Sequence, residues 1–254
     1  MKEQELKEYV AEHGNSLVPH IYTQNKSLGK WVHTQRKYFK ASQRGDAVMP
    51  VQKLNDIGFV WDASKAQWLE RIQELKEYKQ NFGDTLVPAV YDTNPSIGIW
   101  VSHQRRCNTY YEKMTELEEK WRDVEVLDDE VKEQVDQLNL LAGDMNNTRI
   151  ELLEAEGFIW DVRAYLWELQ FQKLQSFIDL NGHAPIMSKK IYDPSAFWVN
   201  TQRKNYRKNL KGQHTSLTEE RIKQLNSIRF DWKVAQRSPK CFEKLLLRSF
   251  ATHL

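Results

Sequence analysis

Apolar residues recur at helical spacing along this chain, in segments that end at glycine. The clearest segment is 68–82, in which Trp68, Ile72 and Leu75 are separated by four and three positions. This spacing places the side chains on one face of an α-helix. Gly83 follows, and glycine commonly ends a helix because it adopts the left-handed conformation without strain. The pattern therefore predicts a helix with one buried face.

The same pattern occurs three times. Each copy continues with a proline-containing connector, a second helix with the sequence Trp-Val-x-x-Gln-Arg, and a third apolar helix that ends before a tryptophan. The glycines that end the first helices are Gly14, Gly83 and Gly182, the connector prolines are Pro19, Pro88 and Pro185, and the closing tryptophans are Trp61, Trp160 and Trp232. Repeats of this length are supersecondary units. The sequence predicts an all-α fold of three small three-helix bundles, over 1–61, 62–161 and 162–233.

The second helix is the most strongly repeated. Its motif runs from Trp31 to Arg36, from Trp100 to Arg105 and from Trp198 to Arg203. At about 100° per residue, the glutamine four positions after the tryptophan lies roughly 40° from it on the helix, and the arginine five positions after it lies about 140° away. The motif therefore predicts a tryptophan and a glutamine at the core and an exposed arginine.

The predicted outer face of these helices is basic. A row of cations on a helix can contact phosphates or lie in a major groove. The candidate phosphate contacts are Arg36, Lys37, Lys40, Arg105, Arg106, Arg203, Lys204, Arg207, Lys208 and Lys211. Two alternatives stay open, namely that these cations only solubilise the helix and that Arg36 stacks on Trp61.

The formal net charge of +2 hides a strong asymmetry. Residues 112–161 carry 5 basic and 16 acidic side chains, whereas 162–254 carry 17 and 7. The acidic residues concentrate in an insertion at about 112–147 of the second copy, where apolar residues spaced by three and four predict helix. The insertion is expected to have a solvated acidic face, to dock a protein partner, or to mask the basic charge of the third copy. The tail 234–254 is basic and is expected to pack on the third copy or to fray.

Several function classes find no support. Cys107 and Cys241 are far apart and the histidines are scattered, so we expect neither a disulfide framework nor a metal site. The sequence has no phosphate-binding loop and no nucleophile elbow, so we expect no enzyme, no cofactor and no small-molecule substrate. No apolar run approaches the roughly 18 residues that span a bilayer, and the N-terminus has no apolar signal-peptide core. These features predict a soluble intracellular protein, in the nucleus or the cytoplasm.

The repeated features resemble the helicase-associated domain family. The shared features are the opening tryptophan, the glycine, the proline connector, the Trp-Val-x-x-Gln-Arg helix and a final Ile-Gly-Phe-x-Trp segment, and they cover 1–233. The resemblance implies small helical bundles that bind nucleic acid, DNA or RNA, without catalysis. A protein-interaction scaffold is the alternative.

Three departures from the family pattern are visible. The first copy lacks the opening tryptophan, and Ala196-Phe197 in the third copy replaces the usual glycine-containing pair. Arg229 stands where the other copies have Gly58 and Gly157. If that turn needs a positive φ, Arg229 is strained there.

Overall fold

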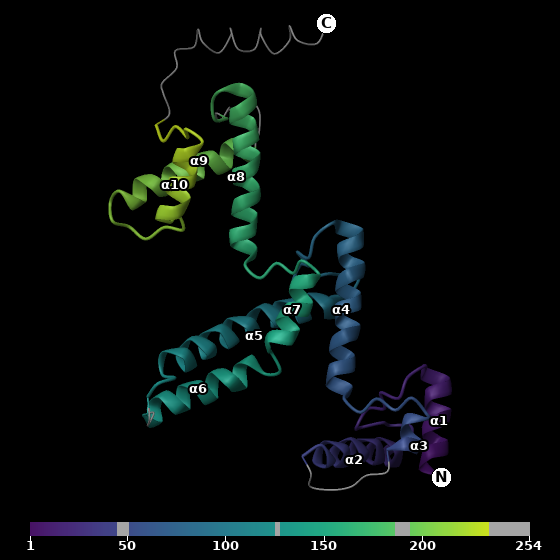
Figure 1. Cartoon of the computed structure of the whole chain (residues 1–254). Coiled ribbons are helices and arrows are strands. Elements are labelled where there is room, and N and C mark those ends of the chain that lie inside the picture. Colours follow the sequence, from purple (N-terminus) through teal and green to yellow (C-terminus); the bar gives the residue numbers. More distant parts are fainter. Residues whose placement is uncertain (45–50, 125–127, 186–193, 234–254) are drawn as a thin grey trace, which may run out of the picture. The chain divides into compact units, whose positions relative to one another are not determined.

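The computed structural model of this chain describes residues 1–44, 51–124, 128–185 and 194–233. Within these ranges every regular element is a helix and no strand occurs (Figure 1), which confirms the all-α prediction. The chain divides into two compact units, one from Met1 to Trp160 and one that begins at Asp161. The prediction for the tail 234–254 lies outside the described residues.

Repeat one consists of α1 (Lys2–His13), α2 (Lys26–Ser42) and α3 (Gln52–Asn55). Its opening tryptophan is missing from the sequence, yet it has a core of its own. The buried apolar residues of that core are Leu6, Tyr9, Val18, Leu28, Val32, Leu54 and Phe59. The third helix of this repeat is a single turn.

Repeat two consists of α4 (Ala63–Phe82), α5 (Pro95–Lys120), α6 (Asp129–Ala142) and α7 (Asn147–Ala155). Repeat three consists of α8 (Val162–Asn181), α9 (Pro194–Asn209) and α10 (Glu219–Ser227). Each has a separate core around its opening tryptophan, Trp68 or Trp167. Burial of about 25 cal/mol for each Å² of apolar surface is the main stabilising contribution in such small bundles.

The helix ends follow the local sequence. Gly14, Gly83 and Gly182 end the first helices with φ of 74°, 84° and 72°. The side chains of Asn25 and Asn94 accept hydrogen bonds from the first turns of α2 and α5, as expected for an N-cap residue. The glycine ends were predicted from the sequence.

The turn before each closing tryptophan has a left-handed residue. Gly58 and Gly157 have φ of 72° and 69°, and Arg229 at the same place has φ of 55°. An L-residue other than glycine is strained there because its Cβ approaches the backbone carbonyl. The positive φ of Arg229 therefore confirms the prediction that this residue is strained.

The connector passes close to the motif helix at Gly29 and Gly98. A Cβ on Gly29 would lie 2.6 Å from the carbonyl oxygen of Pro19, and one on Gly98 would lie 2.8 Å from that of Ala89. Repeat three has Ala196 at this place. Ala196 therefore occupies the position that lies close to the connector in repeats one and two.

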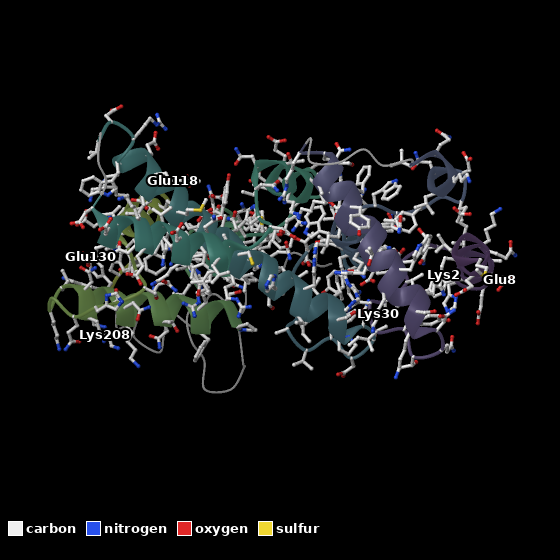
Figure 2. All side chains as sticks on the ribbon, turned by 90° about the horizontal axis from the view of Figure 1, so that it is seen from below. Lys2, Glu8, Lys30, Glu118, Glu130 and Lys208 are labelled. Carbon is white, nitrogen blue, oxygen red and sulfur yellow. The ribbon has the colours of Figure 1, made fainter. Side chains whose placement is uncertain are left out.

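The acidic insertion is helical, as the apolar spacing predicted, and its two helices form a hairpin. Helix α5 continues to Lys120 and packs against α6 along its length (Figure 1). Met114 is buried, and Leu117 and Val135 are half-buried. Figure 2 marks Glu118 and Glu130, which are both exposed. The hairpin thus has an apolar seam and a solvated acidic surface.

Candidate nucleic-acid interface

The arginine of the repeated motif is an internal residue. In repeat one, Arg36 donates from Nε to the carbonyl oxygen of Val60 at 3.0 Å and from Nη2 to that of Ser16 at 2.8 Å. Val60 directly precedes the closing Trp61, and Ser16 lies in the connector. One guanidinium therefore ties three separate segments of the repeat together.

The other repeats use the same arrangement. Arg105 donates to the carbonyl oxygens of Ile159 at 2.9 Å and Thr85 at 3.2 Å. Arg203 donates to the carbonyl oxygen of Asp231 at 2.8 Å and is only 6% exposed. Hydrogen bonds from a charged donor contribute about 1.5–3 kcal/mol each. These contacts stabilise the bundle and leave little of the guanidinium for a ligand.

Each of these arginines also lies over a phenylalanine ring of its own repeat. The guanidinium carbon is 5.4 Å from the ring of Phe59, 5.2 Å from Phe158 and 5.3 Å from Phe230, in the order of the repeats. Burial lowers the pKa of all three guanidinium groups below the ordinary value, because a desolvated cation is less stable. The alternative that Arg36 stacks on Trp61 is therefore wrong. The ring under its guanidinium is Phe59, two residues before that tryptophan.

The prediction that Arg36, Arg105 and Arg203 are exposed is therefore wrong. Arg36 and Arg105 are half-buried and Arg203 is buried. The helical wheel was correct about direction, since the arginines leave the face of the tryptophan. It could not show that the connector and the closing segment cover that side of the helix.

A hydroxyl group reinforces this contact in two repeats. Ser16 Oγ donates to the carbonyl oxygen of Gly58 and accepts from the amide of Val60. Thr85 Oγ1 makes the same pair with Gly157 and Ile159, at 3.1 Å and 3.0 Å. Ser16 and Thr85 are fully buried. Repeat three has Ala184 here and lacks the hydroxyl.

The tryptophan and glutamine of the motif lie where the spacing predicted. The tryptophans Trp31, Trp100 and Trp198 are half-buried, and Gln104 and Gln202 are buried. In repeat two the side-chain oxygen of Gln104 accepts from Trp68 Nε1 at 3.1 Å. The glutamine therefore connects the motif helix to the first helix through the buried indole.

The remaining predicted cations are exposed: Lys37, Lys40, Arg106, Lys204, Arg207, Lys208 and Lys211. Figure 2 marks Lys208 on α9 and Lys30 on α2. One of these positions is basic in all three repeats, namely the sixth residue after the motif tryptophan, which is Lys37, Arg106 or Lys204. The exposed cation of the motif is therefore the residue after the arginine.

Two further cations on α2 were not among the predicted contacts. Lys26 and Lys30 are exposed and continue the row formed by His33, Lys37 and Lys40. Their spacing of four, three, four and three was the signal that could have found them. This row runs along the whole outer side of α2.

An aromatic stack lies beside the cations in two repeats. Phe39 and Trp61 are stacked with ring centroids 4.4 Å apart in repeat one, and Tyr206 and Trp232 are 4.1 Å apart in repeat three. Beside the first stack is a cavity of about 630 Å³. Its lining includes the stacked rings, the basic or imidazole side chains of His33, Arg36, Lys37 and Lys40, and also Ala63, Ser64 and Asp62, whose carboxylate caps α4 by accepting from the amide of Lys65. In repeat two, Asn108 occupies the place of the first ring.

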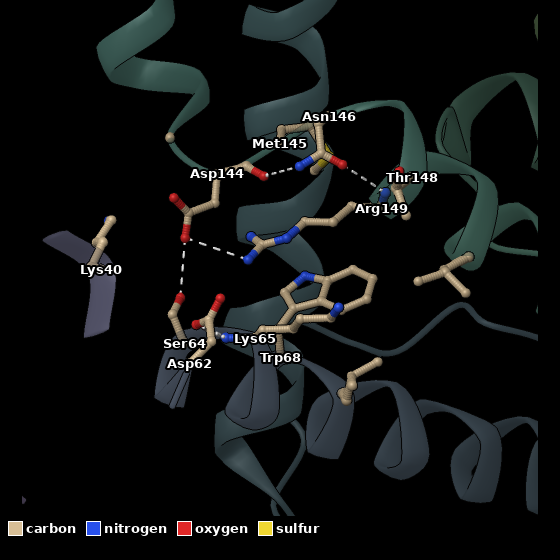
Figure 3. A pocket seen from close by; sticks show the side chains of 13 residues that line it. Lys40, Asp62, Ser64, Lys65, Trp68, Asp144, Met145, Asn146, Thr148 and Arg149 are labelled. Atoms are coloured by element: carbon tan, nitrogen blue, oxygen red, sulfur yellow. Dashed lines mark hydrogen bonds and ion pairs between the residues drawn. The ribbon is translucent and has the colours of Figure 1, made fainter. Parts of the chain in front are cut away.

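A second cavity, of about 550 Å³, lies at the start of α4 (Figure 3). Arg149 projects over the ring of Trp68, with 5.1 Å from the guanidinium carbon to the centroid. Its Nη2 is 3.4 Å from a carboxylate oxygen of Asp144, which also accepts from Ser64 Oγ at 3.1 Å. The central cation of this cavity is thus paired with a carboxylate, which makes the cavity a weaker site for phosphate than the row on α2.

Two other findings bear on function. In the described ranges, no group of three or more histidine, cysteine or acidic side chains is arranged to hold a metal ion. The helices of the same ranges include none with the length and apolar character needed to cross a bilayer.

Comparison with known families gives one match, repeated three times. A family model described as "Helicase associated domain" matches residues 2–62, 65–161 and 164–233. No curated protein and no solved structure matches the chain.

Proposed function

Since this chain belongs to the helicase associated domain family, as three tandem copies, we propose that it is a non-catalytic array that binds nucleic acid through the phosphates. The observation that carries the proposal is the exposed cation in the sixth position after each motif tryptophan, Lys37, Arg106 and Lys204. Cations in this position project from a helix that the neighbouring internal arginine holds in place. A rigid support of this kind lowers the entropy cost of ordering the site on binding.

The surrounding charge supports the same proposal. On α2 five exposed basic or imidazole side chains form one row, and on α9 Lys204, Arg207 and Lys208 are exposed together. Phosphate contacts release condensed counterions, so the affinity of such a surface depends steeply on salt. They carry no sequence information by themselves. We therefore propose binding with little base preference in a duplex.

The test is a titration of the purified protein against duplex DNA, single-stranded DNA and RNA at two salt concentrations. Each contacted phosphate contributes about 0.9 to the slope of log affinity against log salt on duplex DNA. Three contacts, one for each repeat, give a slope steeper than about −2.5. An absence of binding to all three nucleic acids at low salt would refute the proposal.

A protein-interaction scaffold is the second candidate, and the hairpin of α5 and α6 favours it. Leu140 and Leu141 are 82% and 50% exposed on α6, beside acidic side chains. Exposed apolar residues with a charged rim are a feature of protein-binding surfaces. If the titration shows no nucleic-acid binding, this hairpin becomes the leading candidate site, with a basic protein segment as its partner.

A further inference from the structure

We propose that the cavity beside Phe39 and Trp61 binds an unstacked nucleobase, and that the matching stack of Tyr206 and Trp232 does the same. The array would then bind unstacked bases at repeats one and three, whereas repeat two would contact only phosphate. This inference rests on the proposed function, because the same exposed cations would contact the flanking phosphates.

The groove of repeat one has the composition that a nucleotide requires. One wall consists of the stacked rings of Phe39 and Trp61, and Lys37 and Lys40 stand on the side of α2. The volume of about 630 Å³ lies within the range of small-molecule pockets. Aromatic side chains next to cations are the combination with which proteins bind single strands, since bases stack on the rings while cations follow the backbone.

The closing tryptophans are fixed in both repeats. Trp61 donates from Nε1 to the side-chain oxygen of Asn55 at 2.8 Å, and Trp232 donates to that of Asn226 at 2.7 Å. Each indole also packs edge-on against the phenylalanine two residues earlier. A ring held by a hydrogen bond and two neighbouring rings loses little freedom when a base docks on it.

Repeat three repeats the cation pattern as well as the stack. Lys204 and Arg207 are exposed at the sixth and ninth positions after the motif tryptophan, as Lys37 and Lys40 are in repeat one. The ring at the eighth position, Phe39 or Tyr206, lies between them in sequence. Recurrence of all three positions in two repeats is independent support for a common ligand.

Repeat two has lost the same positions together. Asn108 replaces the ring and Thr109 replaces the second cation. The Asn108 side chain is 5% exposed and donates from Nδ2 to Glu112, the first acidic residue of the insertion, at 2.7 Å. An acidic side chain at this place repels phosphate. Repeat two therefore lacks the positions for a base and retains only Arg106 as a phosphate contact.

A groove of this kind selects single strands. In a duplex each base face is covered by its neighbours in the stack, so a base reaches a recessed ring only after unstacking. A single strand already has accessible base faces. Contacts of this type are tolerant of sequence, because every base has an aromatic face.

The test compares a 12-nucleotide oligothymidine with an abasic strand of the same length and phosphate number, by fluorescence anisotropy. We expect the intact strand to bind at least five-fold more tightly, the lower limit for one stacked base. Equal affinity for both strands would overturn this inference and leave the proposed phosphate binding intact. No binding of either strand would overturn this inference, and a further absence of binding to duplex DNA and RNA would overturn the proposed function as well.

Ala63→Phe sharpens the test, because Ala63 lines the cavity at the first residue of α4. The added ring should fill the groove and reduce the preference for the intact strand at least two-fold, since repeat three still binds, without changing the affinity for the abasic strand. The matched control is Val162→Phe, two residues after Trp160, at the first residue of α8. It should change neither affinity, and a preference unchanged by Ala63→Phe would overturn the assignment of this groove.

Photocross-linking of a 5-iodouracil strand to the intact protein gives a second measurement that needs no variant. Cross-links should map to the two stacks, at Phe39 or Trp61 and at Tyr206 or Trp232. Cross-links that spare both stacks would overturn the inference.

Discussion

In repeats two and three the motif arginine donates to the segment before the closing tryptophan, from Arg105 to Ile159 and from Arg203 to Asp231, but the two repeats support that tryptophan differently. Trp232 stacks on Tyr206 and donates to Asn226. Trp160 has neither support, because Asn108 and Glu154 occupy the equivalent positions. Its Nε1 is buried and has no hydrogen-bond partner in the part of the chain that the structure describes.

In repeat two the residues just before the closing Trp160 have an additional support from the connector. Thr85 bonds to Gly157 and to Ile159, whereas Ala184 of repeat three has no hydroxyl to do so. In repeat two a connector hydroxyl thus fixes the segment before the closing tryptophan. In repeat three the hydrogen bond and ring stack of the tryptophan itself fix it. The feature that both retain is the internal arginine, and this indicates that it is the principal structural element of the motif.

The largest expected effect distinguishes the two adjacent basic residues of the motif. Arg105→Ala should reduce the free energy of unfolding of repeat two by about 3 kcal/mol, because it removes charged hydrogen bonds to two carbonyl groups. Arg106→Ala, at the exposed neighbouring position, should change it by less than about 0.5 kcal/mol. Urea unfolding followed by tryptophan fluorescence measures both. Equal changes in the two variants would show that the carbonyl contacts of Arg105 do not stabilise the repeat.

The hydroxyl contact gives the next effect. Thr85→Ala should lower the free energy of unfolding of repeat two by about 2 kcal/mol, since it leaves the amide of Ile159 and the carbonyl of Gly157 without this partner. The reciprocal change Ala184→Ser should stabilise repeat three by about 1 kcal/mol. Amide hydrogen exchange of the two repeats measures both changes. A neutral Thr85→Ala would mean that water replaces the hydroxyl at no cost.

The left-handed turn gives an effect of up to about 1 kcal/mol. Arg229→Gly should raise the stability of repeat three by this amount, because glycine adopts φ of 55° without strain. Gly157→Ala, the matched change in repeat two, should lower stability by a similar amount. Thermal melts of both variants are sufficient. If Arg229→Gly lowers the melting temperature, contacts of the arginine side chain outweigh the strain.

The smallest expected effect concerns the unpartnered indole. Glu154→Asn places in repeat two the residue that accepts from the closing tryptophan in repeats one and three. A new hydrogen bond should stabilise repeat two by about 0.5 kcal/mol, the lower end of the range for such bonds. The measurement is the shift in the urea midpoint, with Glu151→Asn on the same helix as the control. An identical shift in both variants would reflect the lost acidic charge alone.

The sequence predicted the helices because their signals are local. Apolar spacing and the glycines after α1, α4 and α8 act within a few residues of each other. The positive φ of Arg229 could also be inferred, since two glycines at matching positions define the same turn. The helical character of the insertion followed from its spacing of three and four, but the packing of α5 against α6 did not.

The roles of the motif arginines could not be predicted in the same way. A helical wheel shows which residues share a face, but Arg36 is covered by Ser16 and Val60, which are 20 and 24 positions away in sequence. The stack of Phe39 on Trp61 was also missed, because it joins residues from α2 and from the end of the repeat. Contacts of this range depend on how the segments cross, and no local pattern records that.

The most direct test of the account is the salt dependence of nucleic-acid affinity for the triple variant Lys37→Ala, Arg106→Ala and Lys204→Ala. In the proposed complex these three cations contact phosphates, while the preceding arginines bond to backbone carbonyl groups of their own repeats. It predicts that the slope of log affinity against log salt becomes shallower by about 2 to 3, with an unchanged melting temperature. An unchanged slope in a folded variant would contradict the account, because the motif would then bind nucleic acid without its exposed cations.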